Sequence, residues 1–330
     1  MKKVFLTGAD GLLGSNLTRE LLSRGYAVRV FLEEGRNTGT LDGLNIERIT
    51  GNLLNPSDLK SALPGCDYLI HAAASTSIWP TRSEIIRKVN IAGTQNVIDA
   101  ALECHVEKMI HVGTANSFGS GTKESPGDET RPFNGEHFKL DYIDSKYQAH
   151  KDVLDAVKQR GLPAVIVNPT FMIGPYDSTP SSGTMVMSVA TGKVPGFTRG
   201  GKNYVYVKDV ATGIVNALDK GVVGESYILG NSNLSYGEAF GLMADTLNVK
   251  KPRIYFPPAV SMTYALICTL IYRITGKPPQ ISISMARSSN DDCYYTPAKA
   301  VKQLNLPQTD ISIAIRECHE WLLKNEYYKK

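Results

Sequence analysis

KVFLTGADGLLG, residues 3–14, joins a short apolar run to the start of a helical pattern. Lys3–Thr7 is apolar enough for a buried strand, and leucines recur on one face of a helix predicted over Leu12–Ser23. The glycines between them are spaced G-x-x-G-x-x-G, in the strand–turn–helix context of a dinucleotide-binding loop. Glycine admits a tight turn and the close approach of a pyrophosphate, and the helix N-terminus offers free N–H groups. The predicted phosphate-binding residues are Gly8, Gly11, Leu12, Leu13 and Gly14.

The same alternation of strand and helix continues beyond this loop. Further strands are predicted over Ala27–Leu32, Asn45–Thr50, Asp67–Ala73, Lys108–Gly113 and Ala164–Asn168. Helices are predicted over Pro56–Leu63, Arg87–Glu103 and Lys139–Gln159. This order is typical of an α/β fold in which a doubly wound parallel sheet is covered by helices on both faces.

The pattern changes after Pro169. Residues 174–201 are rich in Pro, Gly, Ser and Thr, with one helix expected near Thr184–Thr191. Strands at Val205–Val207 and Tyr227–Leu229 flank a predicted helix over Asp209–Asp219, and the chain from Ser235 onward is mainly helical in pattern. We therefore predict a nucleotide-binding domain of residues 1–170 plus 202–231 and a smaller substrate-binding lobe of residues 171–201 plus 232–330.

Composition excludes several classes of function. The chain has 330 residues, 42% of them hydrophobic, and a net charge of +4 without any block of like charges, so we expect no nucleic-acid partner. None of the five cysteines forms a C-x-x-C pair, which argues against a disulfide scaffold and against a metal site. Reduced thiols, and a first strand that leaves no room for a signal peptide, favour a cytoplasmic location.

The most apolar window is Ala259–Ile274. It contains Ser261, Thr263 and Thr269 and falls short of the roughly 20 apolar residues that a spanning helix needs. We expect a packed helix, with a helix lying on a membrane surface as the alternative, and no membrane insertion.

The position after the second strand chooses between cofactors. A carboxylate there binds the ribose hydroxyls of NAD, whereas an arginine accommodates the extra phosphate of NADP. Glu33 lies 19 residues beyond Gly14, close to the expected spacing, and Glu34 follows it. Arg36 keeps NADP open as the cofactor, but the pair of carboxylates favours NAD.

A candidate catalytic set follows the strand over Lys108–Gly113. Tyr142 and Lys146 are four residues apart in a predicted helix, which puts them on one face. A nearby ammonium is expected to lower the pKa of the Tyr142 phenol, so that the phenol exchanges a proton near neutral pH. Thr114 stands at the carboxyl end of the strand, where ligands bind in open α/β sheets, and offers a hydroxyl to a substrate oxygen.

Taken together, these motifs make the chain similar to the extended short-chain dehydrogenases/reductases. The matching segments, in the order of that family, are TGADGLLG near the start, GNLLN at 51–55, HAAAS at 71–75, NIAGTQNV at 90–97, HVGTANSFG at 111–119, YIDSK at 142–146, NPTFMIGP at 168–175 and YVYVKDVATGI at 204–214. Between Asn168 and Asn231 the chain most resembles the dihydroflavonol-reductase-like branch, which shades into 3β-hydroxysteroid dehydrogenases and sugar epimerases.

The resemblance implies a role for each matching residue. It makes Tyr142 the acid/base, Lys146 the ligand of the nicotinamide ribose that also tunes Tyr142, and Thr114 the second hydroxyl. The other implied residues are Asn90, which helps to hold the site, Asn52 and Leu53 beside the adenine, Ala72 and Ala73 along the cofactor channel, and Pro169 against the nicotinamide. Three positions depart from the common pattern: Asn52 replaces an aspartate, Glu33 an arginine frequent in the flavonoid branch, and Gly113 a serine.

Two activities on a small-molecule substrate are implied. The first is reduction of a carbonyl, or oxidation of a secondary alcohol, with NAD or NADP. The second is epimerisation of a nucleotide sugar by transient hydride transfer, for which Arg199, Lys202, Arg253 and Arg287 are the available cations. A catalytically silent cofactor-sensing protein is disfavoured because both Tyr142 and Lys146 are present. Relatives often form homodimers through paired helices, here expected at Arg87–Glu103 and Lys139–Gln159.

Overall fold

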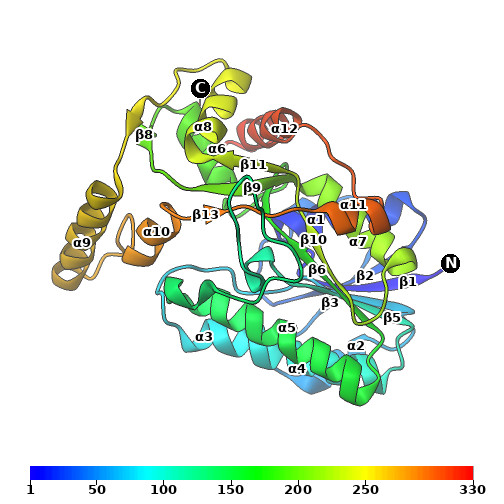
Figure 1. Ribbon diagram of the computed structural model, residues 1–330. Coiled ribbons are helices and arrows are strands. Elements are labelled where there is room, and N and C mark those ends of the chain that lie inside the picture. The colour runs from blue at the N-terminus through cyan, green and yellow to red at the C-terminus, as the bar shows by residue number, and fades with distance from the viewer. Residues whose placement is uncertain (330) are drawn as a thin grey trace.

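A seven-stranded parallel sheet organises the chain in the computed structural model, which describes residues 1–329 (Figure 1). Its strands are β1 (Lys3–Thr7), β2 (Ala27–Leu32), β3 (Glu47–Thr50), β4 (Tyr68–His71), β5 (Lys108–Val112), β6 (Ala164–Pro169) and β10 (Ser226–Leu229). They lie in the order β10-β6-β5-β4-β1-β2-β3, and every neighbouring pair is parallel. The predicted fold class, a doubly wound parallel sheet, is confirmed.

Helices cover both faces of this sheet. One face carries α1 (Leu12–Ser23) and α7 (Val207–Lys220), and the other carries α2 (Pro56–Ala62), α4 (Gly93–Glu103) and α5 (Asp141–Arg160). Alternate residues of one strand supply the two cores, since Leu6 packs on the first face and Phe5 on the second. Both faces of the sheet are therefore buried under helices, as expected for a parallel sheet.

The order of the strands reverses between β1 and β4. The chain runs outward from β1 to β2 and β3, then crosses back to β4, β5, β6 and β10. Loops leaving β1 and β4 consequently diverge to opposite sides, and the crevice between them at the carboxyl edge is where ligands bind in open α/β sheets.

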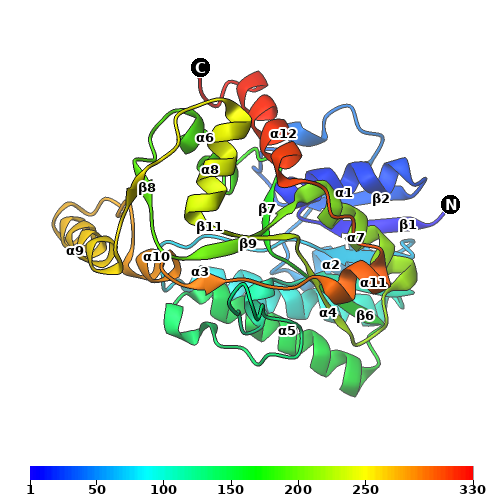
Figure 2. The ribbon, with the colours of Figure 1, turned by 45° about the horizontal axis from the view of Figure 1, so that its top comes forward.

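A second, smaller layer lies beside this edge. It contains the strands β7 (Phe171–Ile173), β9 (Gly201–Tyr206), β11 (Ser232–Ser235) and β13 (Asp292–Cys293), the pair β8 (Gly196–Phe197) and β12 (Ile254–Tyr255), and the helices α6 (Gly183–Ala190), α8 (Tyr236–Leu247), α10 (Ile283–Ser288) and α12 (Ile311–Lys324). Figure 2 shows α8 over β9 and β11, with α6 and α12 beside it. β9 thus pairs in this second sheet and not in the seven-stranded sheet. The division of the chain into two domains stays a prediction.

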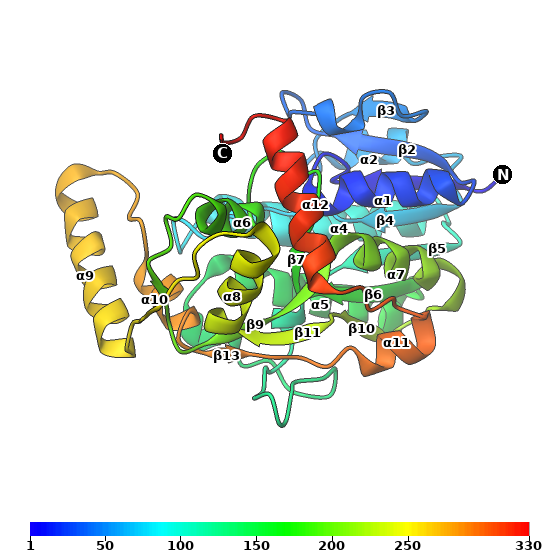
Figure 3. The same ribbon diagram turned by 90° about the horizontal axis from the view of Figure 1, so that it is seen from above.

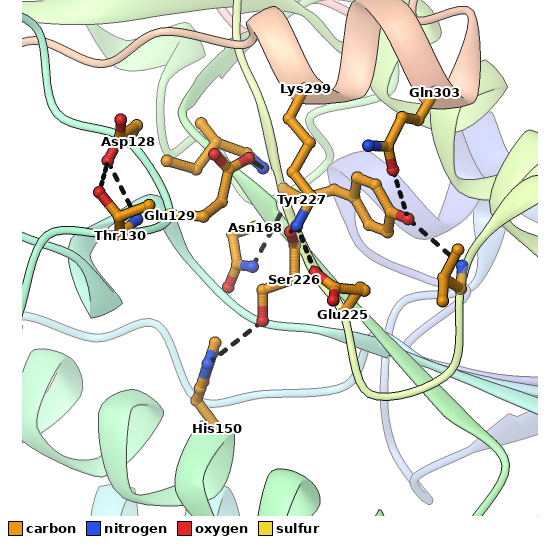
Figure 4. A network of polar contacts seen from close by, with 12 residues as sticks. Asp128, Glu129, Thr130, His150, Asn168, Glu225, Ser226, Tyr227, Lys299 and Gln303 are labelled. Carbon is orange, nitrogen blue, oxygen red and sulfur yellow. Dashed lines mark hydrogen bonds and ion pairs between the residues drawn. The ribbon is translucent and has the colours of Figure 1, made fainter.

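The C-terminal part of the chain returns to the parallel sheet through α11 (Ala298–Leu304). Lys299 Nζ lies 2.6 Å from the Glu225 carboxylate and donates to the Ser226 carbonyl at 2.8 Å. Tyr227 donates its hydroxyl to Gln303 Oε1 at 3.0 Å (Figure 4). These contacts tie the last third of the chain to the edge strand β10.

The apolar helix is α9 (Pro258–Thr275), and its packing differs from expectation. Only 17% of it is buried, and it lies at the edge of the molecule (Figures 1 and 3). Of the described residues, this is the one helix long and apolar enough to cross a membrane by length and composition. The prediction of a packed helix is therefore wrong: the apolar pattern identified the helix but not which side of it is covered.

Candidate active site

The glycine loop follows β1 as predicted, and two of its glycines are required by the backbone. Gly8 has φ +75°, and a Cβ there would lie 2.6 Å from the Ala73 nitrogen. A Cβ on Gly14 would lie 2.0 Å from the Gly8 carbonyl oxygen. Gly11 is less constrained, since its φ is −82° and its Cβ would have an ordinary 3.7 Å contact. The loop is folded so tightly that only glycine fits at two positions.

The N-terminus of α1 suits an anion. No side chain caps the helix at Gly11, and its first turn contains no acidic residue. Its first N–H groups, at Leu12 and Leu13, therefore keep their capacity to donate, next to the positive end of the helix dipole. This cradle fits the pyrophosphate of a dinucleotide.

The predicted ribose-binding carboxylate comes directly after β2. Glu33 is exposed, at the same edge of the sheet as the glycine loop. Arg36 lies across that loop, with Nε 2.9 Å from Asp10 Oδ2. The cation that kept NADP open is thus already paired with a carboxylate of the phosphate loop.

The segment after β3 forms a closed turn. Asn52 Oδ1 accepts a hydrogen bond from the Leu54 backbone N–H at 2.8 Å, and the Asn52 backbone N–H donates to Asp58 Oδ2 at 2.8 Å. The Leu53 carbonyl accepts from Asn96 Nδ2 at 2.8 Å, which joins this turn to α4. Asn52 therefore shapes the loop beside the expected adenine site.

Ala72 and Ala73 follow β4 and close the crevice against the glycine loop. Ala73 donates its amide to the Thr7 hydroxyl at 3.2 Å, and Ala72 donates to the Thr7 carbonyl at 3.3 Å. The Thr7 hydroxyl also shares a 2.8 Å hydrogen bond with His71 Nδ1. Burial lowers the pKa of His71 to about 3, so the ring is neutral and acts as a fixed hydrogen-bonding group.

Tyr142 and Thr114 are brought together from different elements. Thr114 follows β5 and Tyr142 lies in the first turn of α5, and the Thr114 side chain lies close enough to the Tyr142 hydroxyl to act on its pKa. The sequence predicted a lowered pKa for the Tyr142 phenol, but the structure shows the opposite. Burial raises its pKa, while the neighbouring Thr114 side chain and the charge of Lys202 act in the lowering direction.

Lys146 shares the face of α5 with Tyr142 and is buried. Its ammonium donates to the Val112 carbonyl at the end of β5, at 2.7 Å. Burial lowers the Lys146 pKa to about 8, because the low-dielectric site disfavours the charged form. Lys146 is thus held at the sheet edge beside the predicted nicotinamide position.

Asn90 connects the loop after β4 to α5. The helix predicted over Arg87–Glu103 is interrupted there: α3 (Glu84–Arg87) is followed by a π-helical turn, η2 (Lys88–Ala92), before α4 begins. The buried Asn90 amide accepts the Ser75 N–H at 2.7 Å and donates to the Ser75 carbonyl and to the Ser145 hydroxyl, both at 3.0 Å. Such π-turns are frequent at functional sites. This one links Asn90 to the Ser145 hydroxyl, which in turn donates to the Tyr142 carbonyl, and so it fixes the backbone around Tyr142.

Asn90→Ala is expected to reduce turnover. The change leaves the Ser75 N–H and the Ser145 hydroxyl without their partner, which costs roughly 1–3 kcal/mol of stability. It also releases the loop beside Tyr142, so kcat should fall more than cofactor affinity. Steady-state kinetics with thermal denaturation would measure both effects. Gln95→Ala, five residues further along the chain in α4, is the matched control, and equal kcat values for the two variants would contradict the assignment.

Pro169 ends β6 and is buried at the carboxyl edge. The neighbouring Asn168 explains one departure from the family pattern. A Cβ on Gly113 would lie 2.3 Å from Asn168 Oδ1, so the asparagine occupies the space that a serine at 113 would need.

The pattern of the sequence missed part of the wall around Tyr142. The sequence marks Lys202 on β9 only as a candidate diphosphate ligand, yet its charge acts on Tyr142 and its ammonium lies 4.9 Å from the Phe171 ring centroid. Cys293 on β13 pairs with Lys202 and packs, with Phe138, in the apolar cluster that includes Tyr142. The short strands β9 and β13 bring these residues together, and no local motif marks them.

Of the predicted residues, the structure brings Gly8 and Ala73 into contact and places Thr114 beside Tyr142. Lys146 reaches the same strand end as Thr114. Of the proposed diphosphate cations, Lys202 is the one whose charge acts on Tyr142 in the described chain, while Arg253 is exposed before α9 and Arg287 donates to the His137 carbonyl.

Comparisons with known proteins agree with this geometry. Residues 4–230 match the family model described as the NAD dependent epimerase/dehydratase family. A Synechocystis sp. protein named as a dihydroflavonol 4-reductase is 30% identical over 98% of this chain and 96% of its own length. Sterol demethylase protein B of Methylococcus capsulatus is 30% identical over 96% of this chain and 97% of its own length. The crystal structure of gox2253 superimposes with a TM-score of 0.88 at 32% identity, covering 100% of both chains.

The family match spans the glycine loop, the Tyr142–Lys146 pair and the whole parallel sheet. The glycine cradle and the uncapped helix α1 fit the dinucleotide that the family uses. The chain therefore belongs to the NAD dependent epimerase/dehydratase family, and it is an oxidoreductase of the extended short-chain dehydrogenase/reductase type that requires a nicotinamide cofactor.

Proposed function

We propose that the protein reduces a carbonyl group, or oxidises the matching secondary alcohol, with Thr114, Tyr142 and Lys146 as its catalytic set. The observation that carries this proposal is the nearness of the Thr114 side chain to the Tyr142 hydroxyl, at the strand edge that Lys146 also reaches. Two hydroxyls at one point offer two hydrogen bonds to a single substrate oxygen, which is the arrangement that carbonyl chemistry needs.

The residues divide the proton chemistry between them. A bound nicotinamide supplies or accepts the hydride. Thr114 orients the substrate oxygen, and Tyr142 donates its phenolic proton to that oxygen or removes one from it. Burial raises the pKa of Tyr142, so the phenol stays protonated near neutral pH and holds the proton that reduction requires. Lys146 binds the ribose beside Tyr142.

A bulky, largely apolar small molecule suits the wall around Tyr142. The side chains that pack together there are Phe133, Phe138, Leu140, Ile143 and Cys293. Relatives are named for reactions of a dihydroflavonol and of a sterol, both of which are polycyclic molecules with oxygen substituents. This supports a ring-containing ketone or alcohol as the substrate class.

The proposed cofactor is NAD. Glu33 stands where a carboxylate binds the ribose hydroxyls, and Arg36 is held by Asp10. Glu33→Arg is expected to shift the preference toward NADP by roughly tenfold or more, because it exchanges one charged hydrogen bond for another. The ratio of kcat/KM for the two cofactors is the measurement, with Glu34→Arg as the neighbouring control. An unchanged ratio would show that Glu33 does not face the ribose.

We also propose that the protein is located in the cytoplasm and that it forms a homodimer. All five cysteines are unpaired, which suits a reducing compartment. Residues of α3, η2, α4 and α5 line a shallow groove around Ile91, and Ile85 on α3 is 72% exposed. Mass measurement by light scattering tests this dimer, and a monomer at micromolar concentration would contradict it.

Cofactor consumption tests the activity itself. Purified protein is incubated with NADH or NADPH and a panel of aldehydes, ketones and ketosteroids, and the loss of absorbance is followed. Net oxidation of the cofactor is the expected result. No net change with any member, together with tightly bound NAD⁺ that is released on denaturation, would instead support the epimerase alternative, for which Lys202 is the cation placed near Tyr142.

A further inference from the structure

The faces of α9 are inverted relative to those of an ordinary surface helix. Its buried residues are small, namely Ser261, Ala265 and Cys268, which follow one another at helical spacing. The large apolar side chains point outward and are each about half exposed or more: Val260, Tyr264, Leu266, Ile267, Leu270, Ile271 and Ile274. A soluble surface would place these groups inward, so this face has the composition of a surface that is covered by something apolar.

The chain around α9 is uniformly basic. Residues 246–290 contain six cations and no aspartate or glutamate. The cations are Lys250, Lys251, Arg253, Arg273, Lys277 and Arg287. Lys251 pairs with Asp245, but the structure gives Arg253, Arg273 and Lys277 no ion pair within residues 1–329, and all three are exposed. Unpaired positive charges thus lie before the helix and at its end.

The attachment of α9 fixes how it meets a partner. Before the helix, Ile254 on β12 pairs with Gly196 on β8. Along it, Asn290 donates to the Ser261 hydroxyl at 2.8 Å, and the Tyr272 ring packs edge-on against Trp79 with centroids 5.0 Å apart. Both ends and the small face are therefore held on the same body, at the edge of the molecule (Figures 1 and 3). The large apolar side chains of the opposite face are exposed. A helix held in this way lies on a surface and does not cross it.

We propose that α9 docks the protein on the surface of an anionic lipid bilayer. Its outward isoleucines and leucines would enter the boundary between headgroups and acyl chains, and the exposed rings of Tyr255 and Tyr264 would lie at headgroup level. Arg253, Arg273 and Lys277 would contact the lipid phosphates. Charge decides between this partner and a second copy of the chain, since two α9 surfaces of the same sign repel each other whereas an anionic bilayer attracts both.

Vesicle co-sedimentation tests the proposal with the full-length protein. Binding is expected to phosphatidylcholine vesicles that contain phosphatidylglycerol, to weaken as salt rises, and to be much weaker without the anionic lipid. Arg273→Gln with Lys277→Gln should reduce partitioning onto the anionic vesicles by roughly tenfold or more, from the usual contribution of each cation near such a surface. Ile267→Asn with Ile271→Asn should reduce it by at least a similar factor.

A matched control removes apolar groups that are equally exposed elsewhere. Val222 and Val223, 55% and 45% exposed, lie on a loop before β10, and Val222→Asn with Val223→Asn should leave vesicle binding unchanged. All variants alter exposed side chains, so circular dichroism and NADH binding should match the parent protein. Loss of binding in the α9 variants alone would support the proposal. It would be overturned by equal binding of parent and α9 variants, by no binding to either vesicle, or by an α9-dependent dimer in solution without vesicle binding.

Discussion

Tyr142→Phe should abolish most of the turnover while leaving the cofactor bound. The change removes one hydroxyl, the one that lies beside Thr114, and leaves the ring in its apolar cluster. A positioned acid/base contributes roughly 10²–10⁴-fold to the rate, so kcat should fall by about that factor. Cofactor affinity should change little, because the phosphate cradle belongs to β1 and α1. Single-turnover kinetics and fluorescence titration with NADH measure the two quantities separately.

The same helix offers the control for this experiment. Tyr147 lies five residues further along α5 and stacks on Phe133 with ring centroids 4.0 Å apart. Tyr147→Phe keeps that stack and should leave kcat unchanged. Thr114→Val should give an intermediate loss, because the substrate oxygen then keeps only the Tyr142 hydroxyl. Turnover of Tyr142→Phe equal to that of Tyr147→Phe would remove Tyr142 from the mechanism.

The parallel sheet was predictable from local pattern. Each strand of a sheet buried on both faces is a short apolar run, and each following helix has its own periodicity, so β1, α1 and β2 have the predicted bounds. The second sheet was harder to predict from the sequence. β9 pairs with strands from both sides of it in the sequence, and β13 contributes only Asp292–Cys293, which no periodicity can mark in so short a segment.

The candidate site divides in the same way. Residues in motifs, such as Gly14 and the Tyr142–Lys146 pair, could be identified because their function requires a fixed spacing along one element. Their electrostatics could not be identified, since the pKa of Tyr142 depends on how deeply the fold buries it. The relation between Gly113 and Asn168, which are far apart in sequence and in contact in space, was equally hidden.

The buried side of α9 could not be predicted from the sequence either. Periodicity locates α9, but the side it buries depends on what it meets, and the small residues that face the protein are not the ones a hydrophobic pattern selects. A prediction that assigns apolar residues to the core fails where the covering partner belongs to another phase or another molecule.

Gly14→Ala should disrupt the cofactor site from within. The new methyl carbon would lie 2.0 Å from the Gly8 carbonyl oxygen and 2.6 Å from the Ala9 Cα, and both are backbone atoms. No side chain can rotate away, so the glycine loop must move relative to α1. Overpacking of this kind costs roughly 1–3 kcal/mol of stability. A displacement of about 1 Å in a positioned site is enough for roughly a 10²-fold loss of reaction rate. Titration with NADH and thermal denaturation should therefore show weaker cofactor binding together with a lower Tm.

Gly11→Ala separates this steric cause from a general need for glycine in the loop. Its methyl carbon would lie 3.7 Å from the Gly8 carbonyl oxygen, at a φ of −82° that alanine adopts readily. The folded protein should accept it with a small change in Tm, although the methyl group adds bulk on the side where the pyrophosphate approaches the helix N-terminus. If close packing between the loop and α1 shapes the phosphate cradle, Gly14→Ala must lower the Tm clearly more than Gly11→Ala does. Equal losses of Tm in the two variants would mean that the loop relaxes freely, and the cradle would then owe its form to the bound dinucleotide and not to the glycines.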